Sequence, residues 1–171
     1  LNGDEGRNWL SVKTLRQTEQ KLQAVREVIG EDVELKLENH CLTGANTAIQ
    51  FARLAKDYNP MLLEEPANPL DELDYRRIRE AIDIPLATGE RSYTRRGFLP
   101  LLKKGYLDVV QPDLGNCGGI TEGRKIADLA ETFGATVQTH TCNTPISVAA
   151  ALQLEAAIPN FIIHEHHTNN T

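Results

Sequence analysis

Residues 60–66 read Pro-Met-Leu-Leu-Glu-Glu-Pro, an apolar run that ends in two adjacent carboxylates. Comparable apolar runs end at Glu38 and Glu90, so Glu38, Glu64 and Glu90 follow one another at intervals of 26 residues. This interval is about the length of one strand followed by one helix. In a parallel βα array, the three glutamates would therefore stand at the carboxyl ends of neighbouring strands.

The three glutamates are candidate ligands of a divalent cation. A single glutamate after a strand is more often a solvated loop residue, but three at one interval are harder to explain in that way. Burying Glu64 and Glu65 side by side without a partner would also be costly, and a cation supplies the partner. Hard oxygen ligands that converge at one edge of a sheet suit Mg²⁺.

Hydrophobic periodicity elsewhere predicts a regular alternation of helices and strands. Six strands that alternate with helices imply right-handed crossovers and a parallel sheet. The predicted helices are 11–29, 46–57, 70–81, 95–104, 120–133 and 145–157, and the predicted strands are 33–38, 61–65, one that begins at 83–85, 106–112, 135–140 and 161–165.

The expected fold class is α/β, as an incomplete (β/α)₈ TIM-type barrel. A closed barrel needs eight strands and typically about 250 residues, whereas this chain has six predicted strands and, at residues 1–3, the end of another. Residues 1–171 would form one partial domain. A doubly wound open sheet is the alternative, but the Gly-x-Gly-x-x-Gly fingerprint after a first strand is absent.

Composition limits the possible partners. The chain has 171 residues, of which 40% are hydrophobic and 25% charged, as in an ordinary globular domain. A net charge of -6 disfavours nucleic acids and anionic membrane surfaces as partners. No apolar stretch approaches the roughly 20 residues of a membrane span, and the first residues do not resemble a leader peptide. We therefore expect a cytoplasmic protein.

The three cysteines offer an alternative metal site. They include no Cys-x-x-Cys pair, which argues against a disulfide framework. Cys41 follows His40 directly, and Cys142 lies two residues after His140, so a Cys/His zinc site is possible in principle. The glutamates are better spaced and remain the preferred metal ligands.

Two histidines are candidate catalytic residues. Positions two apart in a strand share a face, so Glu38 and His40 would point the same way. Asp113 and His140 end consecutive predicted strands, which predicts a hydrogen bond between them. A carboxylate partner fixes the imidazole tautomer and raises its basicity, which suits a general base. For either histidine alone, a structural role is about as plausible.

The run His164-Glu165-His166-His167 resembles a metal cluster, but strand alternation divides it between two faces. We expect Glu165 to face the site. His167 is a weaker candidate for contact with the substrate.

The order of these motifs resembles the barrel domain of the enolase superfamily, mandelate racemase subgroup, and most closely the sugar-acid dehydratases of the galactonate dehydratase type. The resemblance covers nearly the whole chain. It rests on Glu38 with His40, Glu64-Glu65-Pro66, Gly89-Glu90-Arg91, Gln111-Pro112-Asp113, Gly118-Gly119-Ile120-Thr121-Glu122, His140 and Glu165.

The resemblance implies a role for each of these side chains. Asp113 and His140 would form the base dyad, and Glu165 would hydrogen-bond the substrate carboxylate. His40 would be the acid that protonates the departing hydroxyl, and Asn2 would stand where many relatives carry a lysine. The Mg²⁺ ligands would be Glu38, Glu64 and Glu90.

Two departures from the family pattern are visible. The first ligand is usually aspartate, and Glu38 is one methylene longer. The first strand and the amino-terminal capping domain, whose loops select the substrate, are not within this sequence.

The reaction implied is Mg²⁺-dependent dehydration of an aldonic or aldaric acid. Abstraction of the α-proton would give an enediolate, and loss of the β-hydroxyl would lead to a 2-keto-3-deoxy acid. Alternatives are a cycloisomerase or a racemase or epimerase of the same superfamily, or a catalytically silent sugar-acid-binding domain. The partner would be a small sugar acid, and we expect the full-length protein to be a homo-oligomer.

Overall fold

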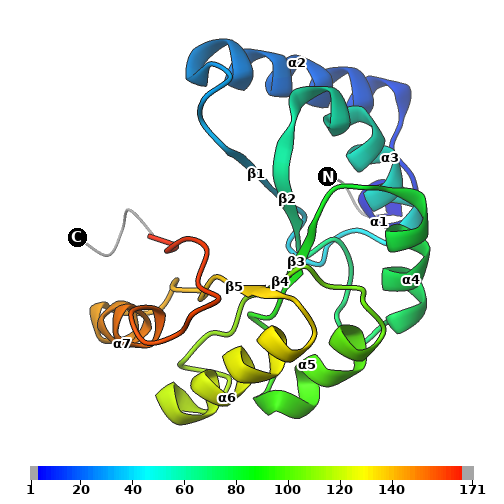
Figure 1. Cartoon of the computed structure of the whole chain (residues 1–171). Coiled ribbons are helices and arrows are strands. Elements are labelled where there is room, and N and C mark those ends of the chain that lie inside the picture. The colour runs from blue at the N-terminus through cyan, green and yellow to red at the C-terminus, as the bar shows by residue number, and fades with distance from the viewer. Residues whose placement is uncertain (1–3, 167–171) are drawn as a thin grey trace. The chain divides into compact units, whose positions relative to one another are not determined.

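The computed structural model describes residues 4–166, in which helices and parallel strands alternate (Figure 1). The chain divides between Leu86 and Ala87 into two compact units. The predicted α/β class is confirmed, with parallel strands in both units. Within the described residues, no helix combines the length and the apolar character needed to cross a membrane.

The first unit contains two strands, the first residue of a third and the described helices that precede it in the chain. Leu63 N–H donates to Pro85 O at 2.8 Å, so the approach to the third strand lies beside the second. The elements are α1 (Asp4–Asn8), α2 (Val12–Ile29), β1 (Leu35–Glu38), α3 (Ala45–Ala55), the short 3₁₀ helix η1 (Lys56–Tyr58), β2 (Pro60–Glu64), α4 (Glu72–Ala81) and the first residue of β3 (Leu86–Thr88).

The second unit contains the rest of β3, followed by helices and two-residue strands. β4 pairs in parallel with both β3 and β5, and helices α5 and α6 pack against each other (Figure 1). Its further elements are α5 (Thr94–Lys103), β4 (Val109–Val110), α6 (Gly119–Thr132), β5 (Thr136–Val137) and α7 (Pro145–Glu155).

Local capping explains where several helices begin and end. Ser11 accepts a hydrogen bond from Thr14 N–H and starts α2. Thr144 and Ser147 form a reciprocal capping box at the start of α7. At the other end of α2, the Arg26 guanidinium donates to the carbonyls of Gly30 and Val33. The capping side chains satisfy N–H groups that a helix start leaves without partners, and Arg26 ties the segment after α2 to its last turn.

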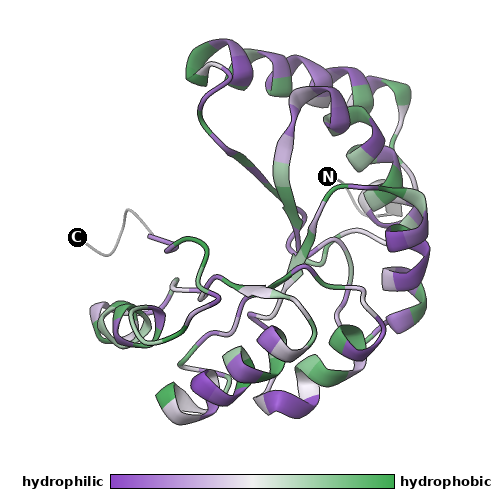
Figure 2. Ribbon diagram, viewed as in Figure 1, coloured by the Kyte–Doolittle hydropathy of each residue, from purple (hydrophilic) through white to green (hydrophobic). Residues whose placement is uncertain are grey.

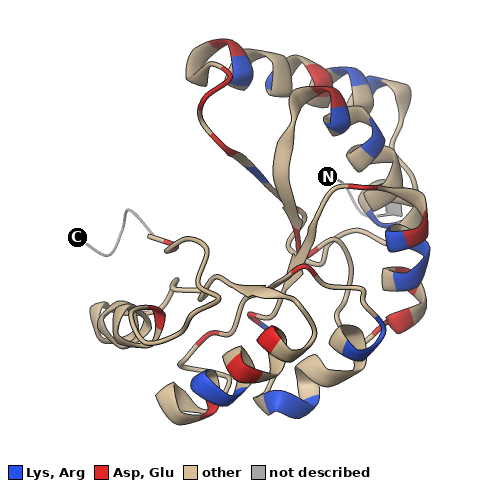
Figure 3. Cartoon of the chain, in the orientation of Figure 1, with Lys and Arg blue, Asp and Glu red and all other residues tan. Residues whose placement is uncertain are grey.

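Each unit has its own apolar core. Leu62, Leu63 and Ile78 are fully buried in the first unit, and Phe98 and Ile126 are buried in the second. Helices α4 and α6 carry both hydrophobic and hydrophilic residues (Figure 2), with acidic and basic side chains interspersed along α2, α4 and α6 (Figure 3). Such helices bury an apolar stripe and present mixed charge to solvent.

The strands carry polar residues to their carboxyl ends. In the first unit, Glu38 and Glu64 are register partners at the ends of β1 and β2. In the second unit, an isolated parallel bridge pairs Asp113 with His140, a few residues beyond β4 and β5. The register therefore brings together side chains that lie about 26 residues apart in sequence.

One local prediction is wrong, one helix was not predicted, and one prediction lies outside the described residues. Residues 161–165 do not form the sixth predicted strand, because only Val137 pairs with Phe161, through an isolated bridge. The helix Asp4–Asn8 was not predicted, since five residues are too few for a periodic pattern. The expected strand end at residues 1–3 lies outside the described part of the chain.

Candidate functional site

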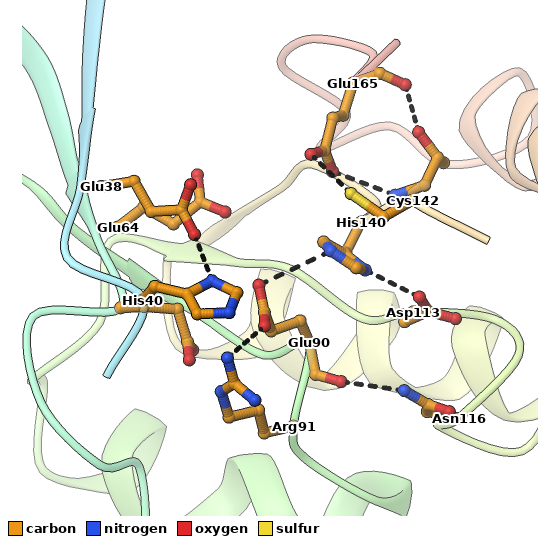
Figure 4. Close-up of polar contacts among 12 residues, drawn as sticks. Glu38, His40, Glu64, Glu90, Arg91, Asp113, Asn116, His140, Cys142 and Glu165 are labelled. Carbon is orange, nitrogen blue, oxygen red and sulfur yellow. Dashed lines mark hydrogen bonds and ion pairs between the residues drawn. The ribbon is translucent and has the colours of Figure 1, made fainter. Parts of the chain in front are cut away.

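A short, largely buried polar contact in the second unit joins Asp113 to His140. Asp113 Oδ2 lies 2.7 Å from His140 Nδ1, so the hydrogen bond expected from the sequence is present (Figure 4). Asp113 is 1% exposed, and the His140 side chain is 14% exposed. With Nδ1–H donated to the carboxylate, the neutral imidazole keeps its lone pair on Nε2, which is the nitrogen that can accept a proton.

The Asp113 carboxylate is held on both oxygens. Gly115 N–H donates to Oδ1 at 2.7 Å, and Asn143 Nδ2 donates to Oδ2 at 2.7 Å. Burial alone would raise the pKa of Asp113. The hydrogen bonds from His140 and from the backbone, together with the charge of His140, outweigh burial and hold the pKa of Asp113 below its usual value of 3.8. The carboxylate therefore stays ionised beside the imidazole.

The opposite side of the His140 ring faces another carboxylate. Nε2 lies 3.5 Å from Glu90 Oε2, and Glu90 is 8% exposed. Burial lowers the pKa of His140. The hydrogen bond to Asp113 and the charges of Glu165, Glu90 and Asp113 raise this pKa by more than burial lowers it, so it lies above 6.5. The Arg91 guanidinium, 2.9 Å from Glu90 Oε1, partly balances this acidic cluster.

Glu165 is oriented by the backbone and side chain of Thr141. Thr141 N–H donates to Glu165 Oε2 at 3.0 Å, and the Thr141 hydroxyl donates to the backbone carbonyl of Glu165. Cys142 Sγ lies 3.8 Å from the other carboxylate oxygen, Oε1 (Figure 4). The Glu165 carboxylate thus contacts Thr141 and Cys142. Its neighbour His164 contacts a different residue, with Nδ1 2.8 Å from Glu155 Oε2.

In the first unit, a turn after β1 brings Glu38 and His40 into contact, and strand alternation does not explain this contact. His40 Nδ1 lies 2.8 Å from Glu38 Oε1 (Figure 4). β1 ends at Glu38, and His40 has a φ of 51°, so it belongs to a left-handed turn and not to the strand. The turn folds the imidazole back onto the carboxylate. Both side chains are about half exposed.

The buried pair Glu64 and Glu65 has protein partners. Lys36 Nζ lies 3.2 Å from Glu64 Oε2, and the Cys41 thiol donates to Glu65 Oε2. The Glu64 side chain is 7% exposed, and Glu65 is fully buried. A metal ion was the charge partner predicted for this pair, whereas the structure provides the Lys36 ammonium.

Sequence reasoning missed three polar residues that contact the candidate site. Lys36 precedes Glu38 by two positions in the same strand, and this spacing was the available signal. Asn143 and Thr141 contact Asp113 and Glu165 from a loop, where no periodic pattern marks them.

The remaining predicted residues fall outside the described range. Asn2 and His167 both do so. Their predicted contact with a substrate stays a prediction.

Comparison with known proteins agrees with the motif order. The family model described as "Enolase C-terminal domain-like" matches residues 4–171. The D-gluconate dehydratase of Thermoproteus tenax is 36% identical over 152 residues, which are 89% of this chain and 31% of that protein. The D-galactonate dehydratase of Variovorax paradoxus is 35% identical over 145 residues, which are 85% of this chain and 38% of that protein.

A solved structure extends the match to the backbone. A member of the enolase superfamily from Salmonella Typhimurium superposes with a TM-score of 0.95 at 43% identity, covering 99% of this chain and 43% of that one. The chain thus spans about a third of the two curated relatives and under half of the solved protein. On the match of the family model to residues 4–171, this chain belongs to the enolase C-terminal domain-like family.

Proposed function

We propose that the chain forms the catalytic part of a Mg²⁺-dependent sugar-acid dehydratase, whose substrate is an aldonic or aldaric acid of the gluconate or galactonate kind. The single observation that carries the proposal is the bond between Asp113 and His140, which leaves Nε2 of a partly buried imidazole as the proton acceptor. The names of the two curated relatives support the reaction and the substrate class.

His140 is the proposed general base. Asp113 fixes its tautomer through Nδ1, so Nε2 can take the proton α to the substrate carboxylate. Asp113 also stabilises the imidazolium that results, because the carboxylate stays ionised. A positioned base of this kind contributes typically about 10²- to 10⁴-fold in rate.

His40 is the proposed acid. Glu38 accepts the hydrogen bond from its Nδ1 at 2.8 Å, which leaves Nε2–H of the charged imidazole to protonate the departing β-hydroxyl. Glu165 would contact the substrate carboxylate, and Thr141 holds it in one orientation. Asn2 and His167 would add substrate contacts. Loss of the hydroxyl as water, followed by tautomerisation, gives the 2-keto-3-deoxy acid.

The donor set offered by Glu38, Glu64 and Glu90 fits Mg²⁺, since all three residues supply hard carboxylate oxygens. Glu38 and Glu64 are register partners on paired strands, and Glu90 lies two residues beyond β3. These residues would hold the ion. When bound to the substrate carboxylate, Mg²⁺ would stabilise the negative charge that develops as the α-proton leaves.

The test uses the full-length enzyme with a panel of aldonic and aldaric acids, and formation of 2-keto-3-deoxy acid is the readout. Activity should require Mg²⁺ and disappear with a chelator. His140→Asn should lower turnover by at least about 100-fold. His166→Asn, at an exposed position, is the matched control and should retain activity. Epimerised or cyclised products instead of a keto acid would contradict dehydration and support an epimerase or a cycloisomerase. No turnover of any acid would favour a binding domain.

A further inference from the structure

Three side chains of different chemistry lie close together, and one of them is the histidine of the dyad. One ligand atom each from His140, Cys142 and Glu165 lies within 4.8 Å of the other two, and Cys142 Sγ is 3.8 Å from Glu165 Oε1. The three residues come from the segment that follows β5 and from the segment near residue 165. All three therefore belong to the second unit.

We propose that His140, Cys142 and Glu165 form a second metal site, which takes a borderline-soft divalent cation such as Zn²⁺. This site uses none of the three glutamates proposed to bind Mg²⁺, although Glu90 Oε2 lies 3.5 Å from His140 Nε2. Thiolate and imidazole are ligands that Zn²⁺ binds strongly, whereas Mg²⁺ prefers oxygen ligands alone. Three protein ligands would leave a fourth tetrahedral position for water.

One of the three ligand–ligand distances needs only a small adjustment, and all three lie within 4.8 Å. Zn–S bonds of about 2.3 Å and Zn–N or Zn–O bonds of about 2.0–2.1 Å place tetrahedral ligand atoms about 3.3–3.6 Å apart. Cys142 Sγ and Glu165 Oε1 are within a few tenths of an ångström of that range at 3.8 Å. Because Cys142 is exposed, its side chain can rotate at little cost in packing.

Neighbouring groups already orient two of the three ligands. Asp113 binds His140 Nδ1, which presents Nε2 to a metal, as carboxylates commonly do for zinc-bound histidines. Thr141 N–H binds Glu165 Oε2, which leaves Oε1 on the side of Cys142. The arrangement therefore supplies outer-shell partners as well as ligands.

Binding involves no redox change. The Cys142 thiol loses its proton to solvent, and the resulting thiolate donates an electron pair to the cation. The neutral imidazole donates its Nε2 lone pair, and Glu165 donates a carboxylate oxygen. With Nε2 occupied, His140 could not accept a proton, so Zn²⁺ would inhibit the enzyme. This inhibition rests on the proposed function, but the binding itself does not.

The binding test uses Co²⁺ as the probe, because Zn²⁺ has a filled d shell and no useful absorption. Titration of the reduced protein should give a thiolate-to-cobalt charge-transfer band that saturates at one equivalent, persists in excess Mg²⁺ and is displaced by Zn²⁺. Cys142→Ser should abolish the band and weaken Zn²⁺ binding by at least about 100-fold, more than the 10- to 100-fold loss typical of an outer-shell partner.

Cys41→Ser is the matched control, because the serine hydroxyl can still donate to Glu65 and the residue lies in the other unit. It should leave the band unchanged. Cys142→Ala provides a second thiol-free variant, and circular dichroism checks that each variant is folded. Absence of the band in the wild type, or its persistence in both Cys142 variants, would overturn the site.

The functional consequence is measured separately on the full-length enzyme. Zn²⁺ should inhibit the Mg²⁺-supported reaction of the wild type, and Cys142→Ser should keep the basal activity while resisting Zn²⁺ at least about tenfold better. A cobalt band without inhibition by Zn²⁺ would support the metal site but contradict the role of His140 as the general base. Equal inhibition of both proteins would contradict inhibition through this site.

Discussion

Asp113 and His140 are paired twice, by a parallel backbone bridge and by a 2.7 Å hydrogen bond between Oδ2 and Nδ1. Backbone pairing fixes the distance between the two residues, and the side-chain bond fixes the orientation of the ring. The dyad thus depends on the register of neighbouring strands, so its geometry does not rely on a flexible loop alone.

Asp113→Asn should lower the pKa of His140. In the wild type, the hydrogen bond and the nearby carboxylates outweigh burial, and the pKa lies above 6.5. The variant loses the Asp113 charge but keeps the burial, which disfavours the imidazolium. NMR titration of the metal-free chain measures the change. Asp128→Asn, at an exposed helix position beside Arg124, is the control and should leave the pKa of His140 unchanged.

The same shifts determine how stability depends on pH. The folded-state pKa of His140 is raised, so its stabilising contribution is complete below pH 6.5 and is lost as pH rises through that pKa. The pKa of Asp113 is lowered, so its contribution is present above pH 3.8 and is lost as pH falls through the folded-state pKa. An unchanged His140 pKa in Asp113→Asn would contradict this account of the dyad.

Lys36→Met should destabilise the metal-free chain and increase the stabilisation given by Mg²⁺. The variant removes the ammonium 3.2 Å from Glu64, a carboxylate whose side chain is 7% exposed. We expect a loss of about 1–3 kcal/mol, because a buried charge loses a partner. If Glu64 is a metal ligand, Mg²⁺ then supplies a larger share of the compensating charge. Thermal unfolding with and without Mg²⁺ measures both effects.

Lys56→Met is the matched control for this prediction. Lys56 pairs with Asp83 at 3.7 Å, and both side chains are mostly exposed, so the variant should change stability little and leave the Mg²⁺ effect unchanged. An equal Mg²⁺ shift in wild type and Lys36→Met would argue against Glu64 as a ligand.

Gly89→Ala should be strongly destabilising. A Cβ at this position would lie 2.6 Å from Phe98 Cε1 and 2.7 Å from the Gln111 backbone nitrogen. The Gln111 backbone could move away only by disturbing the close packing around it. We expect a loss above about 3 kcal/mol, at the upper end of overpacking costs. Urea unfolding measures it. Gly89 is thus required for the close approach that places Glu90 beyond β3.

Gly105→Ala separates this steric effect from backbone strain. Gly105 has a φ of 69° and open space where a Cβ would lie, so alanine there should cost only about 1–2 kcal/mol. Similar losses for the two variants would show that crowding at Gly89 is not the cause.

Local patterns predicted most of the fold because each helix and strand carries its own periodicity. The equal spacing of the glutamates predicted strand ends, and Glu38 and Glu64 are indeed register partners. The segment 161–165 was wrong as a strand, since its apolar residues fit the pattern but it meets β5 through only one bridge. Strand formation there depends on a neighbour that sequence periodicity does not specify.

The site was predictable where strand ends determine it and obscure where turns do. Strand alternation predicted only that His40 and Glu38 point the same way, and the contact between them arises from a left-handed turn. Asn143 bonds Asp113 from 30 residues further along the chain. Such a contact depends on tertiary packing, which spacing alone does not report.

The central claim is that His140 removes the α-proton and His40 assists loss of the hydroxyl. The most direct measurement is proton NMR of a sugar acid that the full-length enzyme binds or converts, incubated with enzyme and Mg²⁺ in deuterium oxide. His140→Asn should lose both α-proton exchange and keto acid formation, while His40→Asn should retain exchange and lose dehydration. Exchange or dehydration at the wild-type rate in His140→Asn would contradict the account.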